Sequence, residues 1–356
     1  MNNSKSKLQY NAVVKIRFNF LPSLWKEEYS CDQLTPEEWL AEREPNLALG
    51  IVYMALGFVF VFLCIPVIVV LTKKDLIKNS CYKIIMFLSC VDCFTLIFIA
   101  IATGWFTILG SVFCTDPYVI YICGMCSFMG WTESCLLCLI LAFNRIIDIT
   151  SPYLLNLLFS GKRTLIWLGI AQCYGLLMCL FTPSLSFSSK QSWAWFFDPY
   201  HGIEKIHSET TYINWNQTAN NVIIIVALPT MYSIFIVILF YKYKKNSNNL
   251  KLTSSQKSLL IQTGMICSMS LIAASIYLSM NFVNVSAPLI VTGQITWILD
   301  QSSGAISLVF FNKTVRTHIY DMFCPAFLKK WIGIDGKKTV TNTKIMKIRA
   351  RLIKIT

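Results

Sequence analysis

The sequence predicts an all-α polytopic membrane protein: a seven-transmembrane helix bundle with its N-terminus outside and a short amphipathic helix after the seventh span. Three observations predict this fold. Hydrophobic residues make up 55% of the 356 residues, and the mean hydropathy is +0.56. Charged residues contribute only 14%, against about 25% in a soluble domain. Apolar runs long enough to cross ~30 Å of hydrocarbon recur along the chain, and Lys and Arg gather on alternate connections.

Seven apolar runs are each long enough to span a bilayer as a helix. Helices are expected rather than barrel strands, because the runs are long and continuously apolar. The seventh run is the least apolar, since it includes Gln294, Asp300 and Gln301. The predicted spans are Leu47–Leu71, Cys81–Leu109, Val119–Phe143, Thr164–Phe187, Ala219–Tyr241, Ser258–Met280 and Pro288–Phe311.

These spans divide the chain into four parts. Residues 1–46 form an extracellular tail, and residues 47–311 form the bundle. Apolar residues at helical spacing predict that residues 312–324 form an amphipathic helix along the inner membrane surface. Residues 325–356 form a basic cytoplasmic tail.

The distribution of basic residues predicts the orientation. The connection after the fifth span carries five lysines and no acid, whereas the connections after the second and sixth spans carry no Lys or Arg. Because basic residues favour the cytoplasmic side, the N-terminus is expected outside and the C-terminus inside. The net charge of +13 is then a basic surface that faces anionic lipid headgroups, so membrane lipids are expected partners and nucleic acid is not.

Two of the 14 cysteines differ from the rest. Most lie inside the spans, where Cys packs as a small apolar residue. Only Cys31 and Cys114 are predicted to face the oxidising outside, and we expect a disulfide between them; two free thiols are the alternative. No metal site is predicted, because the three histidines all lie outside the spans.

Three positions are candidates for covalent modification. Asn216 and Asn284 each begin an Asn-X-Ser/Thr sequon on the predicted outer side. Cys324 follows the predicted amphipathic helix on the inner side and is a palmitoylation candidate. Each of these motifs is short, so each stays a candidate.

The predicted outer loop between the fourth and fifth spans is crowded with aromatic residues. Two interpretations remain open. The loop is either a lid over a ligand cavity or an aromatic patch at the membrane interface. The candidate lid residues are Trp193, Trp195, Phe196 and Phe197.

Three acids lie inside the spans: Asp92, Glu133 and Asp300. Each lies about 11 to 14 residues into its span, so a rise of about 1.5 Å per residue puts all three near one depth. A charge at this depth is costly and persists only where it faces protein, water or an ion. Two interpretations remain open. One is a cation or proton site, with Na⁺ near Asp92 as the candidate ion and no organic cofactor. The other is a set of protonated or hydrogen-bonded acids that hold the helices together.

Asn144, Arg145 and Asp148 lie at the predicted cytoplasmic end of the third span. Rhodopsin-like receptors place their activation arginine at this end of the third helix. The alternative interpretation is an ordinary basic anchor on the inner side. Spacing alone does not choose between the two.

Several short stretches between about residues 28 and 324 match the pattern of one protein family in the same order. No single stretch is strong alone, but together they make the match specific. They are Cys31 with Glu38-Trp39, Ser80-Cys81-Tyr82-Lys83, Gly110–Cys114 with Pro117, Asn144–Asp148, Leu158–Thr164, Phe196–Pro199, Tyr212-Ile213-Asn214 with Asn220-Asn221, Gly293-Gln294, Trp297, Gly304 and Asn312–Arg316. With these stretches the chain resembles the nematode chemoreceptors called serpentine receptors class T, a rhodopsin-like G-protein-coupled receptor group.

The resemblance implies a chemosensory receptor and not an enzyme. Such a receptor would bind a small environmental chemical or pheromone in the outer half of the bundle and signal to a heterotrimeric G protein at its inner face. It would lie in the plasma membrane of sensory neurons, with sensory cilia as one location. Two departures leave the activation mechanism open: Asn144 precedes Arg145 where most rhodopsin-like receptors carry an acid, and Gly304-Ala305 stands in place of an Asn-Pro-x-x-Tyr element.

The alternative function is a proton- or sodium-coupled membrane transporter that uses the intramembrane acids as a relay. The odd number of spans and the absence of a visible internal repeat in the sequence argue against it. An intramembrane metal hydrolase would need His residues within the spans, and the sequence has none there.

Overall fold

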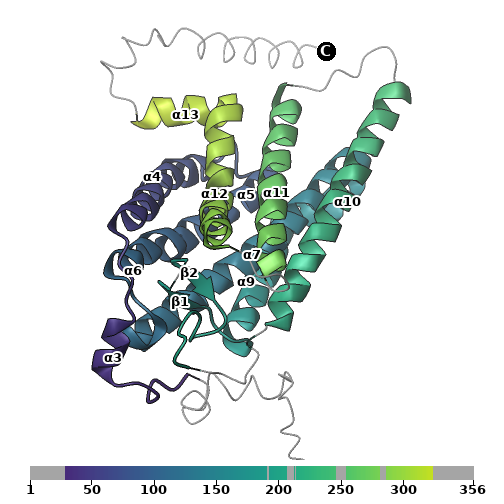
Figure 1. Cartoon of the computed structure of the whole chain (residues 1–356). Coiled ribbons are helices and arrows are strands. Elements are labelled where there is room, and N and C mark those ends of the chain that lie inside the picture. The colour runs from purple at the N-terminus through teal and green to yellow at the C-terminus, as the bar shows by residue number, and fades with distance from the viewer. Residues whose placement is uncertain are drawn as a thin grey trace, which may run out of the picture.

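The computed structural model describes residues 29–190, 192–206, 212, 214–245, 254–280 and 286–323. Within them, seven long helical segments pack into one bundle (Figure 1). They are α4 (Leu47–Leu71), α5 (Ser80–Leu96) continued by the π-helix η1 (Ile97–Ala102) and α6 (Thr103–Leu109), α7 (Pro117–Thr150), α9 (Arg163–Phe181), α10 (Trp215–Lys245), α11 (Ser254–Met280) and α12 (Ala287–Phe311).

Shorter elements cover the two ends of the bundle. They are α3 (Pro36–Ala41), the 3₁₀ turn η2 (Phe113–Thr115), α8 (Pro152–Phe159), β1 (Ser186–Ser188), β2 (Ala194–Phe196) and α13 (Lys313–Phe323). Strands β1 and β2 form an antiparallel hairpin that lies, with α3, at one end of the molecule, and α13 lies across the other (Figure 1). We call these the hairpin end and the α13 end.

The predicted helical bundle is confirmed. Among the described residues, six of the long segments are long and apolar enough to cross a membrane. Helix α12 is not one of the six, because Gln294, Asp300 and Gln301 interrupt its apolar sequence. All three side chains are buried inside the bundle, as are Ser302 and Ser303. The seventh helix therefore keeps its polar residues away from lipid, as a span with charges must.

The predicted end of the fourth span is wrong. The sequence predicts that the fourth span continues to Phe187, whereas α9 ends at Phe181. Thr182 already has extended backbone angles (φ −130°, ψ 158°). The cause is Pro183, because a proline disfavours helical geometry in the residue before it and cannot donate a helical hydrogen bond. The chain beyond it turns back across the bundle and forms β1.

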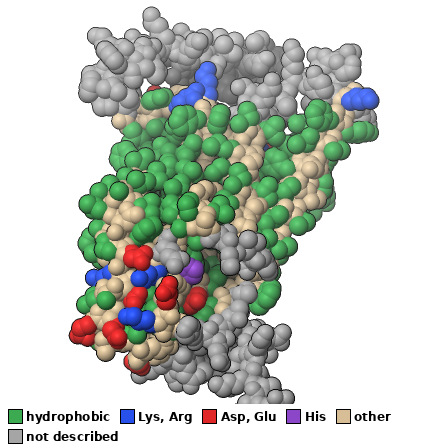
Figure 2. Space-filling model, viewed as in Figure 1, with side chains coloured by type: hydrophobic (Ala, Val, Ile, Leu, Met, Phe, Trp, Pro, Cys, Tyr) green, Lys and Arg blue, Asp and Glu red, His purple; other side chains and the backbone are tan. Residues whose placement is uncertain are grey.

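The surface between the two ends is apolar. Figure 2 shows hydrophobic side chains covering the middle of the visible face, with acidic and basic side chains gathered at the hairpin end. Large side chains such as Phe62 and Val237 are 78% and 66% exposed on this belt. Exposed apolar area of this extent is typical of a surface that faces lipid.

The predicted amphipathic helix is present as α13. Its start is fixed by Asn312, whose side-chain oxygen accepts from the backbone N–H groups of Thr314 and Val315 at 3.1 Å each. Val315 is fully buried against the bundle and Ile319 packs at its margin. Residues 1–28, Cys324 and residues 325–356 lie outside the described residues.

The predicted disulfide is present at the hairpin end. Cys31 and Cys114 are bonded, with their Cα atoms 5.5 Å apart. Two further contacts hold the same segment: the Trp39 indole N–H donates to the Cys31 carbonyl at 2.9 Å, and the Tyr200 hydroxyl donates to the Ser30 carbonyl at 2.6 Å. The N-terminal segment is thereby fixed over the bundle.

Candidate functional site

The hairpin places two of its aromatic side chains inside the bundle. Trp195 is 3% exposed, and its indole N–H donates to the Thr103 hydroxyl at 2.7 Å, at the junction of η1 and α6. The ring of Phe197 lies edge-on to Phe128 of α7, with centroids 5.9 Å apart. These contacts tie the hairpin to the second and third long segments.

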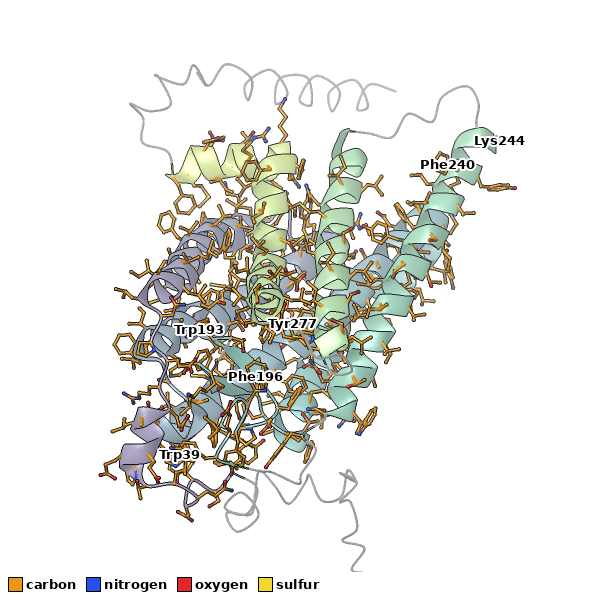
Figure 3. All side chains as sticks on the ribbon, viewed as in Figure 1. Trp39, Trp193, Phe196, Phe240, Lys244 and Tyr277 are labelled. Carbon is orange, nitrogen blue, oxygen red and sulfur yellow. A yellow bond between two sulfur atoms is a disulfide. The ribbon has the colours of Figure 1, made fainter. Side chains whose placement is uncertain are left out.

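The other two candidate lid residues contact the outer layer of the hairpin end (Figure 3). Trp193 is half-buried and donates its indole N–H to the Glu44 carbonyl at 2.7 Å. Phe196 stacks on His201 at 3.6 Å between centroids. Burial at this position lowers the pKa of His201 below its usual value. The four aromatic residues therefore divide between the bundle interior and its cover.

An ion-pair cluster fastens the hairpin to the N-terminal segment. Lys190 Nζ lies 2.9 Å from Glu42 Oε2 and 3.1 Å from Glu44 Oε1, and Lys205 Nζ lies 3.3 Å from Glu42 Oε1. Hydrogen bonding to Lys190 holds the pKa of Glu42 below its usual value. Burial alone would lower the pKa of Lys190, but the hydrogen bonds to Glu42 and Glu44 outweigh it and raise that pKa.

The substitution Lys190→Met is expected to loosen this cover. The pKa of Glu42 lies below its usual 4.5, so its pairing contributes stability above that pH and loses it as the pH falls further. Removing the Lys190 charge should lower the free energy of unfolding by about 1 kcal/mol near neutral pH. It should also make the fall in Tm between pH 7 and pH 4 smaller. Thermal unfolding at pH 7 and pH 4 measures both effects. The exposed Lys162→Met is the control, and a variant matching wild type at both pH values would contradict the prediction.

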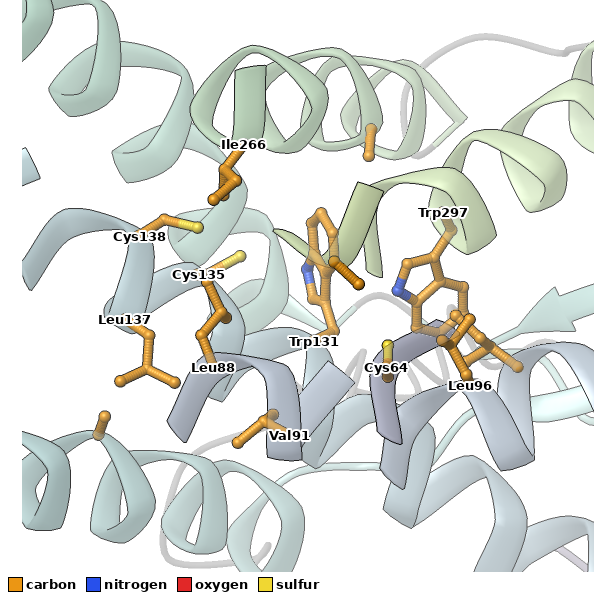
Figure 4. Close-up of a cluster of buried hydrophobic side chains, with 14 of the residues drawn as sticks. Cys64, Leu88, Val91, Leu96, Trp131, Cys135, Leu137, Cys138, Ile266 and Trp297 are labelled. Carbon is orange, nitrogen blue, oxygen red and sulfur yellow. The ribbon is translucent and has the colours of Figure 1, made fainter. Parts of the chain in front are cut away.

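Beneath the hairpin lies a group that we call the aromatic–amide cluster: Tyr53, Trp131, Asn221, Tyr277, Gln294 and Trp297. The rings of Trp131, Tyr277 and Trp297 have centroids 5.5 to 6.4 Å apart. Figure 4 shows Trp131 and Trp297 facing each other across the interior. The cluster draws on α4, α7, α10, α11 and α12, so it joins five of the long helices.

The amide side chains of the cluster fix its geometry. Trp131 donates its indole N–H to Asn221 Oδ1 at 3.1 Å. Gln294 donates to the Ile99 carbonyl of η1 at 2.7 Å and accepts from the Tyr277 hydroxyl at 3.4 Å. A π-helical turn inside a helix often occurs at a functional site. Here that turn provides the carbonyl that Gln294 binds.

Three polar atoms of this cluster have no hydrogen-bond partner among the described residues: Tyr53 Oη, Asn221 Nδ2 and Trp297 Nε1. All three residues are 3% exposed or less. Buried polar atoms are nearly always paired, and an unpaired one destabilises the fold. These unpaired atoms make the cluster a candidate binding site.

Two of the three predicted intramembrane acids lie together, one turn further from the hairpin. Ser134 Oγ lies 3.2 Å from Asp92 Oδ1 and 3.3 Å from Gln301 Oε1. Ser270 donates to Asp300 Oδ1 at 2.7 Å, and Asp300 lies close enough to Asp92 for the two carboxyl groups to interact. This polar layer connects α5, α7, α11 and α12.

Glu133 lies apart from these two acids. Its side chain faces α9, where Glu133 Oε2 is 3.3 Å from the point at which a Cβ on Gly175 would stand. Residues 133 and 134 are neighbours in sequence but about 100° apart around the helix, so only Ser134 faces Asp92. Among the described residues, no group of three or more His, Cys, Asp or Glu side chains could hold a metal ion. Sodium near Asp92 stays a prediction.

Arg145 lies near the α13 end of α7. It is 8% exposed and pairs with Asp148 at 3.1 Å. Asn144 donates its side-chain N–H to Ser80 Oγ at 3.0 Å and offers its oxygen to Arg145 at 3.5 Å. The residue that stands where related receptors carry an acid therefore links α7 to the start of α5.

A small, partly open cavity of about 10 Å³ borders Arg145 between α7, α10 and α11. The residues lining it are Ala142, Arg145, Met231, Tyr232, Phe235, Leu260 and Thr263. Most of these side chains are apolar, and the guanidinium of Arg145 carries the charge.

Several residues of these sites have no role assigned from the sequence. Asn312 donates to the Tyr82 hydroxyl at 2.9 Å, which joins the start of α5 to the end of α12. Both residues lie in stretches that carry the family resemblance, which was the available signal. In the aromatic–amide cluster, Asn221 and Gln294 could have been identified as amides inside apolar runs.

The candidate modification sites are placed unevenly. Asn216 is exposed in the first turn of α10, at the hairpin end. Asn284 and Cys324 lie outside the described residues. The modification of all three stays a prediction.

Comparison with known proteins adds two findings. The model of the family described as serpentine type 7TM GPCR chemoreceptor Srt matches residues 15–331. The chain is 24% identical to serpentine receptor class T-55 of Caenorhabditis elegans over 292 residues, which cover 81% of this chain and 78% of that protein. The family match extends over all seven long segments and α13.

Proposed function

This chain belongs to the Srt family of serpentine seven-transmembrane G-protein-coupled chemoreceptors, and from that premise we propose how it works. A small environmental chemical or pheromone binds in the hairpin-end half of the bundle. The occupied receptor then engages a heterotrimeric G protein at the α13 end. The family is a class of membrane receptors and not of enzymes, as the sequence motifs predict.

Two features support an extracellular hairpin end. The Cys31–Cys114 disulfide lies there, and disulfides persist in oxidising compartments. The basic connection between α10 and α11 leaves the bundle at the opposite end, which the positive-inside rule assigns to the cytoplasm. A receptor for external chemicals in this orientation belongs in the plasma membrane, with sensory cilia as one location.

The aromatic–amide cluster is the proposed ligand site. It lies beneath the hairpin, it combines aromatic surface with unpaired polar atoms, and it joins five helices. A ligand there changes the relative stability of the helix arrangements that these side chains hold. Binding then shifts the population toward the arrangement with the higher ligand affinity.

The polar layer around Asp92 and Asp300 is the proposed hinge. It lies between the ligand site and Arg145, and it links four helices through Ser134, Ser270 and Gln301. A buried acid pair is stable only where protons, hydrogen bonds or a cation compensate its charge. A shift of α11 or α12 would break the present hydrogen bonds of Asp92 and Asp300 and form new ones. The bundle would then have two distinct helix arrangements, each with its own set of hydrogen bonds.

The observation that carries the coupling proposal is the position of Arg145. The buried guanidinium borders the cavity between α7, α10 and α11 and is held by Asp148 and Asn144. Separation of these helices would widen the cavity and release the guanidinium to donate hydrogen bonds to a carbonyl or carboxylate of a G protein.

Nucleotide exchange on a panel of Gα subunits tests this function. The purified receptor, alone and with pools of small organic compounds, should accelerate exchange on at least one Gα. Arg145→Ala should reduce the acceleration at least 10-fold, as expected when a charged hydrogen-bonding partner is lost. The exposed Arg163→Ala is the matched control. No exchange on any Gα from a folded receptor would contradict the proposal.

A further inference from the structure

We infer that the ligand is a small neutral molecule with hydrogen-bond acceptors, such as carbonyl or ether oxygens, that accept from the unpaired N–H groups of Trp297 and Asn221. The inference rests on the proposed function, because it assigns a ligand class to the aromatic–amide cluster. The polar atoms of the cluster that already have hydrogen-bond partners limit what a ligand can offer.

The amide oxygens of the cluster already accept hydrogen bonds from other side chains. Asn221 Oδ1 accepts from the Trp131 indole at 3.1 Å and from Asn220 Nδ2 at 3.4 Å. Gln294 Oε1 accepts from Tyr277, and Gln294 Nε2 donates to the Ile99 carbonyl. Every amide oxygen of the cluster therefore already has a donor.

The atoms left over are donors. Trp297 Nε1 and Asn221 Nδ2 have no partner among the described residues, and neither nitrogen can accept. The Tyr53 hydroxyl is unpaired as well and can donate or accept. Trp131 lies beside both residues: its ring lies 6.1 Å from that of Trp297, and its N–H binds Asn221 Oδ1. In Figure 4 the indole nitrogen of Trp297 is on the side of the ring that faces Trp131.

The cluster contains no charged side chain, so an ionic ligand would find no counter-ion among its six residues. Asp300 lies about one helical turn beyond Trp297 on α12, and its Oδ1 already accepts from Ser270. An ammonium group would meet N–H donors, and a carboxylate would find no Lys, Arg or His in the cluster to balance its charge. Gln217 Oε1, one turn nearer the hairpin end on α10, is also unpaired. An added hydroxyl is therefore compatible with the site, whereas a net charge is not.

The first test needs no ligand. Trp297→Phe keeps the aromatic ring and removes a buried donor without a partner, so the Tm of the ligand-free receptor should rise. Trp131→Phe removes a paired donor and leaves Asn221 Oδ1 with only the longer bond from Asn220 Nδ2 at 3.4 Å, so the Tm should fall. Trp105→Phe, on an exposed ring of α6, is the control and should leave Tm unchanged. A fall in Tm for Trp297→Phe as large as that for Trp131→Phe would overturn the inference, because the N–H would then have a structural partner.

The second test identifies the ligand class. Purified receptor is screened by thermal shift with matched sets on several carbon skeletons, each set comprising a ketone, an amine, a carboxylate and a hydrocarbon; acetophenone, 1-phenylethylamine, 2-phenylpropionate and cumene form one. Ketones should account for the compounds that raise Tm, and Trp297→Phe should weaken their binding about 10-fold, the effect of one hydrogen bond. Amines, carboxylates or hydrocarbons that stabilise equally well would overturn the inference, as would a screen in which no set member binds.

The two proposals can fail separately. Thermal shift uses the receptor without a G protein, so ketone binding that depends on Trp297 stands even if no Gα responds. Nucleotide exchange driven by an amine or carboxylate would support the receptor function and overturn the ligand class.

Discussion

Replacing Gly124 by Ala is expected to prevent the receptor from folding correctly. A Cβ at this position of α7 would lie 1.8 Å from the Leu185 carbonyl oxygen and 2.7 Å from its carbonyl carbon. These are backbone atoms, so no side-chain rotation relieves the collision. Ser184 holds the same segment, since its hydroxyl donates to the Tyr121 carbonyl at 2.9 Å. The hairpin or α7 must move, at a cost of roughly 3 kcal/mol or more.

Gly169→Ala provides the matched control for this prediction. A Cβ at Gly169, in α9, would meet no atom within 4 Å, and alanine favours a helix by up to about 1 kcal/mol over glycine. The control should therefore reach the cell surface at wild-type levels or above. Surface expression and the Tm of the purified protein measure both variants. If Gly124→Ala matched Gly169→Ala in both, the close approach of β1 to α7 would be wrong.

The sequence predicts the helices well because lipid imposes a simple requirement on them. Runs of apolar residues mark α4 to its ends at Leu47 and Leu71, as predicted. The helix ends outside the apolar core are less predictable, since α7 continues seven residues beyond the predicted Phe143 to Thr150. The hairpin could not be predicted, because strands of three residues are held by contacts such as Trp195 to Thr103 that bring distant segments together.

The sites show where a one-dimensional pattern lacks information. Depth along a helix follows from residue number, and it places Asp92, Glu133 and Asp300 at one level. Direction around the helix requires the packing partners to be known, and it brings Asp300 near Asp92 while turning Glu133 toward α9. Trp131 and Trp297 are a similar case, because aromatic residues in a span usually only pack. The N–H of Trp131 has a partner and the N–H of Trp297 has none. Only the three-dimensional structure reveals this difference.

Removal of the Cys31–Cys114 disulfide is expected to produce the second large effect. The bridge joins residues 83 positions apart, and the loop-entropy argument gives about 4 kcal/mol for a loop of this length. Without the bridge, weaker contacts hold the N-terminal segment. They are the bond from Tyr200 to the Ser30 carbonyl, the packing of Tyr29 on Phe113 and Tyr121, and the ion pairs of Glu42 and Glu44. The double substitution Cys31→Ser with Cys114→Ser should therefore lower the Tm and expose the hairpin end to proteolysis.

A reducing agent separates the bridge from the substitutions themselves. Reduction should lower the Tm of the wild type to that of the double variant and leave the double variant unchanged. Cys173→Ser, at an exposed free cysteine, should respond to reductant as the wild type does. Thiol titration first establishes that the bridge has been reduced. If the Tm of the wild type then stays constant, the prediction is contradicted. In that case the ion pairs of Lys190 with Glu42 and Glu44, and not the disulfide, would hold the N-terminal segment on the hairpin.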